Sequence, residues 1–111
     1  MDIVKETKLI GNYLIGLRKD FHKYPELSMQ EHRTSRKIKE ELDKINVKYK
    51  EGIRTEVVAT IGHGEGKVIA LRADMDALRI KENTGVRYQS ENEGVMHACG
   101  HDAHMASRSE E

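Results

Sequence analysis

The expected fold is decided by the stretch Gly94-Val95-Met96-His97-Ala98-Cys99-Gly100-His101-Asp102-Ala103-His104. Residues 95–99 suit a short strand, and Asp102 stands where a following helix would begin. Upstream of this stretch, two helical patterns precede two strand-like runs. Helices, then strands, then a helix predict an α/β fold with a mixed sheet.

The same stretch is rich in side chains that bind divalent transition metals. Five of the eight residues from His97 to His104 carry an imidazole, a thiol or a carboxyl group, and these groups are the usual ligands of such ions. Cys99 and His101 are two positions apart, so in an extended segment both side chains point to the same side. The alternative interpretation is a polar loop with several histidines and a buried free thiol.

The other two histidines of the stretch have different expected roles. His104 follows His101 by three positions, so the two would share one face of a helix. We expect His97 to be structural, or to support a ligand, rather than to bind a metal itself.

A second candidate for chemistry is the segment Arg72-Ala73-Asp74-Met75-Asp76-Ala77-Leu78. It directly follows a predicted buried strand, and loops at strand ends are where α/β proteins place catalytic groups. Asp74 and Asp76 could orient a metal ligand, bind a metal, or hold a general base in position. The alternative is that one of the two aspartates caps a turn.

Two amphipathic helices are predicted before these segments. The first runs from about Ile3 to Tyr24 and is ended by the only proline, Pro25. The second runs from about Met29 to Lys44 and begins with a capping-box pattern, in which Ser28 and Glu31 satisfy each other's backbone N–H groups. The expected buried positions share a helical spacing; they are Ile3, Ile10, Leu14, Leu17 and Phe21 in the first helix, and Ile38, Leu42 and Ile45 in the second.

Two short runs of β-branched and apolar residues predict a hairpin. Residues 57–61 and 68–72 both suit buried strands. Residues 62–66, which include three glycines, form the turn between them.

Composition excludes several classes of protein. The 111 residues include 19 basic and 19 acidic side chains, so the basic excess typical of nucleic-acid binding is absent. No run of 18 apolar residues is present, which excludes a transmembrane helix, and the first residues lack the apolar stretch of a secretory signal. The single cysteine is typical of a reducing compartment. We therefore expect a cytoplasmic protein that binds neither nucleic acid nor a membrane.

Three stretches together resemble the metal-dependent amidohydrolases of the M20 peptidase group. The most similar branch includes hippurate hydrolases, N-acyl-amino-acid amidohydrolases, auxin-conjugate hydrolases and N-acetyldiaminopimelate deacetylase. The stretches occur in the order that the family has them, and the resemblance extends to about Ala106. They are His22-Lys23-Tyr24-Pro25-Glu26-Leu27-Ser28, Ala70-Leu71-Arg72-Ala73-Asp74-Met75-Asp76-Ala77-Leu78 and the stretch from Gly94 to His104.

The resemblance implies a helix-flanked catalytic α/β domain that holds two divalent metal ions, zinc or manganese. A smaller inserted domain often mediates dimerisation of the intact enzyme. Cys99 and His101 match metal ligands of the family. Asp74 and Asp76 match an aspartate pair beside the metals, one of which is catalytic; Asp76 takes the place of the wider group's catalytic aspartate, and Asp74 that of a histidine. The implied reaction is hydrolysis of the amide bond of small N-acyl amino acids.

The chain departs from the family pattern at two places. Arg79 stands where the family usually has proline, which alters a loop but no ligand. After Ala106 the match ends, and the family's paired glutamates, remaining metal-binding histidines and smaller domain would lie downstream. We therefore expect residues 1–106 to be the N-terminal portion of a truncated catalytic domain, residues 107–111 to be an unrelated polar tail, and this chain alone to be inactive. The alternatives are a small non-catalytic metal-binding or interaction module, and an enzyme whose remainder is encoded separately.

Overall fold

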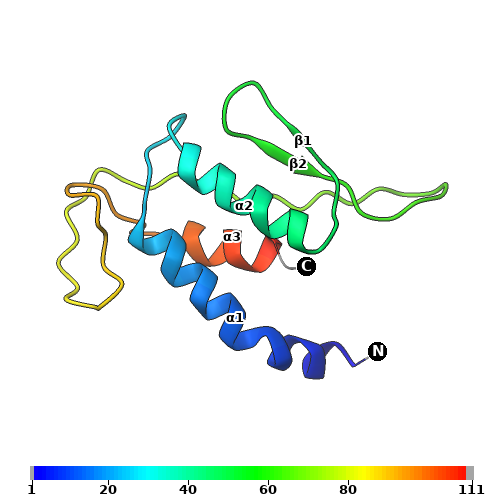
Figure 1. Ribbon diagram of the computed structural model, residues 1–111, viewed down its shortest axis with the longest axis horizontal. Coiled ribbons are helices and arrows are strands. Elements are labelled where there is room, and N and C mark those ends of the chain that lie inside the picture. Colours follow the sequence, from blue (N-terminus) through cyan, green and yellow to red (C-terminus); the bar gives the residue numbers. More distant parts are fainter. Residues whose placement is uncertain (1, 110–111) are drawn as a thin grey trace.

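The computed structural model describes residues 2–109, and within that range it contains three helices and two short strands (Figure 1). Helix α3 packs along α1 and also contacts α2, and the β1–β2 hairpin contacts α2. In chain order the elements are α1 (Ile3–Lys23), α2 (His32–Lys44), β1 (Tyr49–Glu51), β2 (Val57–Ala59) and α3 (His101–Ser109).

Helix α1 has nearly the predicted bounds. Its first turn is capped by Asp2, whose side chain accepts a hydrogen bond from the backbone N–H of Lys5. The expected apolar stripe is buried only in its C-terminal half, where Leu17 and Phe21 are covered. In the N-terminal half, Ile3 is 73% exposed. Within the described part of the chain, the apolar stripe of α1 is therefore covered only along its C-terminal half.

Helix α2 begins three residues later than expected, and the predicted capping box is wrong. The N-cap residue is Glu31 rather than Ser28, and the Glu31 side chain makes no capping hydrogen bond. The free backbone N–H groups of the first turn are satisfied by Glu26 instead. Its carboxylate accepts from the backbone N–H of Arg33 at 3.1 Å and from that of Thr34 at 2.6 Å. A side chain from the preceding loop thus starts this helix.

The predicted hairpin between residues 57–61 and 68–72 is wrong. Strand β2 pairs in antiparallel fashion with β1, in a register that places Lys50 opposite Val58. Residues 68–72 form no strand, and Val68 and Ile69 are 93% and 86% exposed. Apolar, β-branched composition favours a strand only where a partner strand supplies hydrogen bonds and cover. Strand β2 has a hydrogen-bonded partner in β1, although Val58 is 60% exposed, whereas residues 68–72 have no partner strand among the described residues.

Isolated bridges align three loop segments beside the helices. Leu27 pairs with Ala77 in parallel fashion, and Leu78 pairs with Met96 in antiparallel fashion. The second pair is held by two backbone hydrogen bonds of 2.9 Å each. Of the strand expected at residues 95–99, only the bridge at Met96 forms. These bridges fix the segment that carries the two aspartates next to the segment that enters α3.

The core lies between α1 and α3. It consists of Leu17, Phe21, Met105 and Ala106, with Met75 among the side chains packed against it. Helix α3 begins within one residue of the expected start at Asp102, and it continues to Ser109. The division of the chain at residue 106 stays a prediction.

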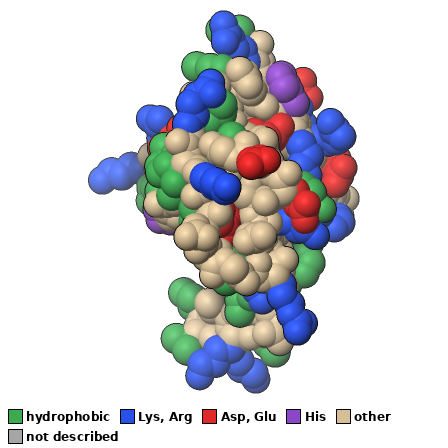
Figure 2. Space-filling view, turned by 90° about the vertical axis from the view of Figure 1, so that its left-hand side faces the viewer, with side chains coloured by type: hydrophobic (Ala, Val, Ile, Leu, Met, Phe, Trp, Pro, Cys, Tyr) green, Lys and Arg blue, Asp and Glu red, His purple; other side chains and the backbone are tan. Residues whose placement is uncertain are grey.

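The surface carries charges of both signs. Figure 2 shows the side that lies on the left in Figure 1, where acidic and basic side chains are both spread and hydrophobic side chains are exposed among them. Among the described residues, no helix has the length and apolar character needed to cross a membrane.

Candidate functional site

Three of the four site residues predicted from the sequence lie close together. His101 is the first residue of α3, and its Nδ1 lies 3.0 Å from the backbone oxygen of Asp76 and 3.1 Å from the Asp76 carboxylate. On the other side of the ring, Nε2 lies 3.9 Å from the carboxylate of Asp74. The bridges at Ala77 and Leu78 hold the aspartate segment in this place.

The contact with Asp76 selects one form of the His101 ring. A backbone carbonyl oxygen can only accept a hydrogen bond, so Nδ1 must carry the proton and donate it. In the neutral ring, Nε2 then presents a lone pair on the side of Asp74. Metal-binding histidines characteristically donate their other ring N–H to a carbonyl or carboxylate oxygen in this manner. His101 therefore has the form that a metal ligand requires.

Asp74 is engaged by a neighbour along the chain. The Arg72 guanidinium lies 3.0 Å (Nε) and 2.9 Å (Nη2) from one carboxylate oxygen of Asp74. The other oxygen is the one that faces His101. Because the Arg72 side chain is largely exposed, this ion pair is a weak restraint. The carboxylate is thus accessible beside the imidazole.

Cys99 is exposed, so the interpretation as a buried free thiol is wrong. It precedes His101 by two residues, with Gly100 between them. A Cβ atom built at Gly100 would lie 3.2 Å from Cε1 of His104, so the glycine makes room for that ring. The turn that connects Cys99 to His101 is therefore compact.

The donor set has the right chemistry for a divalent transition metal, since it combines a thiol, an imidazole and two carboxylates. Within residues 2–109, however, no group of three or more such side chains converges tightly enough to hold an ion. The candidate groups in the described part of the chain are therefore the His101–aspartate cluster and the exposed thiol of Cys99.

A second polar cluster lies beneath the start of α3, and sequence reasoning did not single it out. The His22 ring is buried between two carboxylates: Nδ1 lies 2.9 Å from Asp102, and Nε2 lies 2.9 Å from Glu82. The same Asp102 oxygen also accepts a 2.9 Å hydrogen bond from Nε of Arg18. Arg18 and His22 are four residues apart, so they share one face of α1. This four-residue spacing was the sequence feature that could have indicated a polar cluster on α1.

Each ring nitrogen of His22 faces a carboxylate oxygen. An ionised carboxylate only accepts hydrogen bonds, so a ring nitrogen that carries a proton can donate it to the carboxylate that it faces. Burial alone would raise the pKa of Glu82, but hydrogen bonds from the Thr84 hydroxyl, the Ser90 N–H and His22 outweigh it and lower that pKa. His22 with its two partners is thus a buried, charged hydrogen-bond network.

His97 is 2% exposed, in line with the structural role expected for it. Neither of its ring nitrogens has a hydrogen-bond partner within residues 2–109. Burial lowers its pKa, although the charge of Asp102 acts in the opposite direction. Burial therefore favours the neutral form of this imidazole.

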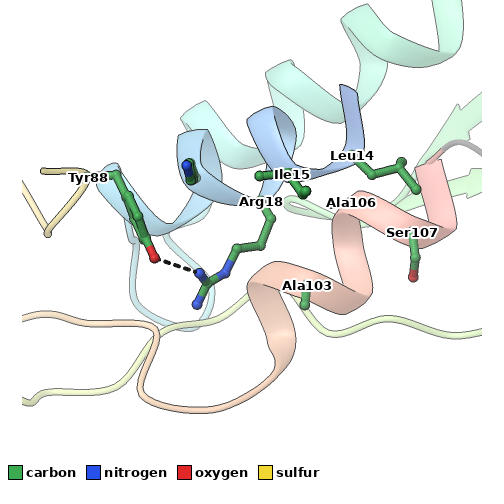
Figure 3. Close-up of a pocket in the computed structure, with 8 residues that line it drawn as sticks. Leu14, Ile15, Arg18, Tyr88, Ala103, Ala106 and Ser107 are labelled. Carbon is green, nitrogen blue, oxygen red and sulfur yellow. Dashed lines mark hydrogen bonds between the residues drawn. The ribbon is translucent and has the colours of Figure 1, made fainter. Parts of the chain in front are cut away.

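A shallow groove of about 360 Å³ runs between α1 and α3 (Figure 3). Arg18 reaches across it and donates a hydrogen bond to the Tyr88 hydroxyl. The lining residues are Leu14, Ile15, Arg18, Lys19, Tyr88, Ala103, Ala106 and Ser107. None of the four predicted site residues lines this groove, so it is separate from the His101 cluster.

Comparisons with known proteins converge on one family. Residues 70–108, which contain both aspartates, Cys99 and His101, match the model of peptidase family M20/M25/M40. The chain is 47% identical to thermostable carboxypeptidase 1 of Saccharolobus solfataricus, over 96% of this chain and 29% of that protein. It is 49% identical to N-acetyl-L-cysteine deacetylase of Bacillus subtilis, over 85% of this chain and 23% of that protein.

The fold agrees with a solved structure. The Bacillus subtilis YXEP protein, a dinuclear metal binding peptidase from the M20 family, matches with a TM-score of 0.86 and 43% sequence identity. The match covers 92% of this chain and 30% of that one. The chain thus spans less than a third of the length of these relatives. The α/β fold class expected from the sequence is confirmed, and both the sequence of residues 70–108 and the fold of the chain match those of the M20 family of peptidases.

Proposed function

We propose that this chain carries part of the active site of a metal-dependent amidohydrolase that cleaves the amide bond of small N-acyl amino acids. The observation that carries the proposal is the His101 ring, whose Nδ1 is held by Asp76 and whose Nε2 is left to bind a metal. The name of the relative N-acetyl-L-cysteine deacetylase supports an N-acyl amino acid as the substrate.

In this proposal Cys99 and His101 are metal ligands. Asp76 fixes the His101 ring through Nδ1, and the Asp74 carboxylate lies 3.9 Å from Nε2, where it would help to hold a bound ion. One of the two aspartates is the catalytic one. A bound divalent ion, zinc or manganese, would supply a water of lowered pKa and polarise the scissile carbonyl. The dinuclear site of the YXEP protein supports two ions in the complete site.

The exposed thiol supports a cytoplasmic location. Cys99 is the only cysteine, and it is accessible on the surface. Exposed thiols persist in compartments that glutathione and thioredoxin keep reducing, whereas oxidising compartments favour their oxidation. We therefore propose that the protein acts in the cytoplasm.

Cobalt substitution tests the ligand assignment. Thiolate ligation of Co²⁺ gives a charge-transfer band in the visible and near-ultraviolet spectrum, which we expect in the wild-type chain. Cys99→Ser should abolish the band. His63→Ala, which removes an exposed histidine from the loop that follows β2, is the matched control and should keep it. A band that persists in Cys99→Ser, or no band in the wild type, would contradict the assignment.

A chimera tests the reaction. Residues 1–108 of this chain would replace the matching part of N-acetyl-L-cysteine deacetylase, to which the sequence is 49% identical. We expect the chimera to hydrolyse N-acetyl amino acids when manganese or zinc is added, and His101→Ala in the chimera to reduce kcat/KM about 100-fold or more, in the range that metal-ligand support commonly contributes. A folded chimera without metal-dependent turnover would contradict the proposal.

A further inference from the structure

The buried network around His22 connects three parts of the molecule. His22 belongs to α1, Asp102 to the first turn of α3, and Glu82 to the loop that precedes the Cys-Gly-His segment. The side chains of His22, Asp102 and Glu82 are 4%, 1% and 3% exposed. Because both ring nitrogens are engaged, the imidazole cannot rotate without breaking two buried ion pairs. The His22 ring is therefore held in one orientation, and it holds the first turn of α3 through its contact with Asp102.

The Asp102 carboxylate has little freedom. One oxygen accepts from Arg18 and from His22, which project from neighbouring turns of α1. The other oxygen accepts from the backbone N–H of Ala103, at the start of α3 itself. An acidic side chain at this end of a helix is also favoured by the helix dipole. Asp102 therefore fixes both the position and the rotation of the first turn of α3.

His101 directly precedes Asp102 on that turn. Consecutive residues of an α-helix project about 100° apart. With Asp102 directed into α1, His101 is directed to a different side, and there it meets Asp76. A small rotation of α3 that released Asp102 from α1 would also move the His101 ring away from its acceptor. The two contacts are thus geometrically coupled through the helix.

We propose that His22 and Asp102, with Arg18, are positioning residues that orient His101 for metal binding. The proposal rests on the function proposed above, because it assumes that His101 is a ligand. The side chains of His22 and Asp102 act through α3 in this proposal and would not bind the metal or the substrate themselves. Their part is to hold α3 so that Nδ1 of His101 donates to Asp76 and Nε2 stays free.

The test replaces Asp102 by asparagine. Asn has one acceptor oxygen where Asp has two, so at least one of the three donors around this side chain loses its acceptor. The readout is the ¹⁵N chemical shifts of the His101 ring in the metal-free chain, at a pH where that ring is neutral. We expect the wild type to show a proton fixed on Nδ1. Asp102→Asn should show exchange between the two neutral tautomers.

The matched control is Glu41→Gln. Glu41 is a second buried acid, 1% exposed, which accepts from Tyr13, Lys37 and Lys44 rather than from any residue of α3. The control removes the same charge from a comparable depth, and we expect its His101 shifts to equal those of the wild type. Arg18→Gln is a milder variant, because Arg18 is partly exposed and His22 remains on Asp102. It should show a smaller shift toward tautomer exchange.

These outcomes decide the proposal even where one variant does not fold. If Asp102→Asn leaves the His101 tautomer unchanged, or if Glu41→Gln changes it equally, the positioning role is wrong. If Asp102→Asn is unfolded, the comparison of Arg18→Gln with Glu41→Gln decides in the same way.

Titration with Co²⁺ gives a second readout. We expect Asp102→Asn to bind about 10–100-fold more weakly than the wild type, as for other groups that support a metal ligand. Failure of the wild type to bind Co²⁺ would contradict the proposed function, while the ¹⁵N shifts would still decide whether Asp102 positions His101.

Discussion

Single residues in this chain are held mainly by buried carboxylates. Glu82 holds His22, Glu41 holds Tyr13 at the contact between α1 and α2, and Glu31 accepts a 2.8 Å hydrogen bond from the Thr55 hydroxyl. Glu82 and Glu41 are each satisfied by several donors, which is the condition for burying a charge at an acceptable cost. The stability of the chain should therefore depend on pH in the range where carboxylates titrate.

Glu82 gives the sharpest test of this dependence. Its hydrogen bonds lower its pKa below the ordinary value of about 4.3 that it has in the unfolded chain. The unfolded state therefore binds the proton first, so the stabilisation by Glu82 is fully present above about pH 5 and is lost as the pH falls through the folded pKa. We expect the difference in unfolding free energy between wild type and Glu82→Gln to shrink between about pH 5 and pH 3.

Urea unfolding at a series of pH values measures that difference. Glu93→Gln, at an exposed position of the same loop, controls for the change in net charge. A difference between wild type and Glu82→Gln that stays constant over this range, or grows as the pH falls, would show that Glu82 is not preferentially ionised in the folded chain.

Some of the candidate site residues could be identified from the sequence, and others could not. Asp74, Asp76 and His101 were found from their spacing and position, and the fold brings them together. The partnership of His22 with Glu82 and Asp102 joins residues 60 and 80 positions apart. No local pattern encodes such a distance. Contacts of this kind depend on how α1 and α3 pack, and that packing is a property of the folded chain.

At the scale of elements, helices were predicted well and strands poorly. A helix satisfies its own backbone, so amphipathic spacing and Pro25 were enough to give α1 within one residue at its C-terminal end. A strand depends on a partner from elsewhere in the chain, and composition does not name that partner. Residues 57–59 formed the expected strand but paired with residues 49–51, which had no strand-like pattern.

The start of α2 provides a prediction at this scale. Glu26 receives the backbone N–H groups of Arg33 and Thr34, whereas Ser28, the capping residue expected from the sequence, does not cap the helix. Glu26→Ala should therefore lower the free energy of unfolding by about 1 kcal/mol, which is typical for loss of a capping side chain. Ser28→Ala should change it by less than about 0.5 kcal/mol. Urea unfolding measures the free energy of unfolding of both variants. If Ser28→Ala lowers it as much as Glu26→Ala does, the prediction that Ser28 caps α2 would be supported after all.

At the scale of the whole molecule, the core is small and one-sided. Four buried apolar residues lie between α1 and α3, while the segment 61–71 is largely uncovered. Its exposed apolar side chains are Ile61, Val68, Ile69 and Leu71, at 71%, 93%, 86% and 62% exposure. An extended, apolar backbone with free hydrogen-bonding groups is a template for pairing with another chain. The isolated chain should therefore self-associate through this segment.

The double variant Val68→Thr/Ile69→Thr tests this expectation at the two most exposed positions of the segment. Threonine keeps the β-branched shape and removes apolar surface. Because both side chains are already in water, the substitutions should change the free energy of unfolding by less than about 0.5 kcal/mol each. Self-association, measured by sedimentation velocity over a range of protein concentrations, should decrease clearly. As a control, Lys67→Thr alters the same segment without removing a large apolar side chain and should leave association nearly unchanged. Equal self-association of the wild type and the double variant would show that another surface mediates it. The exposed apolar residues of α1 would then be tested next.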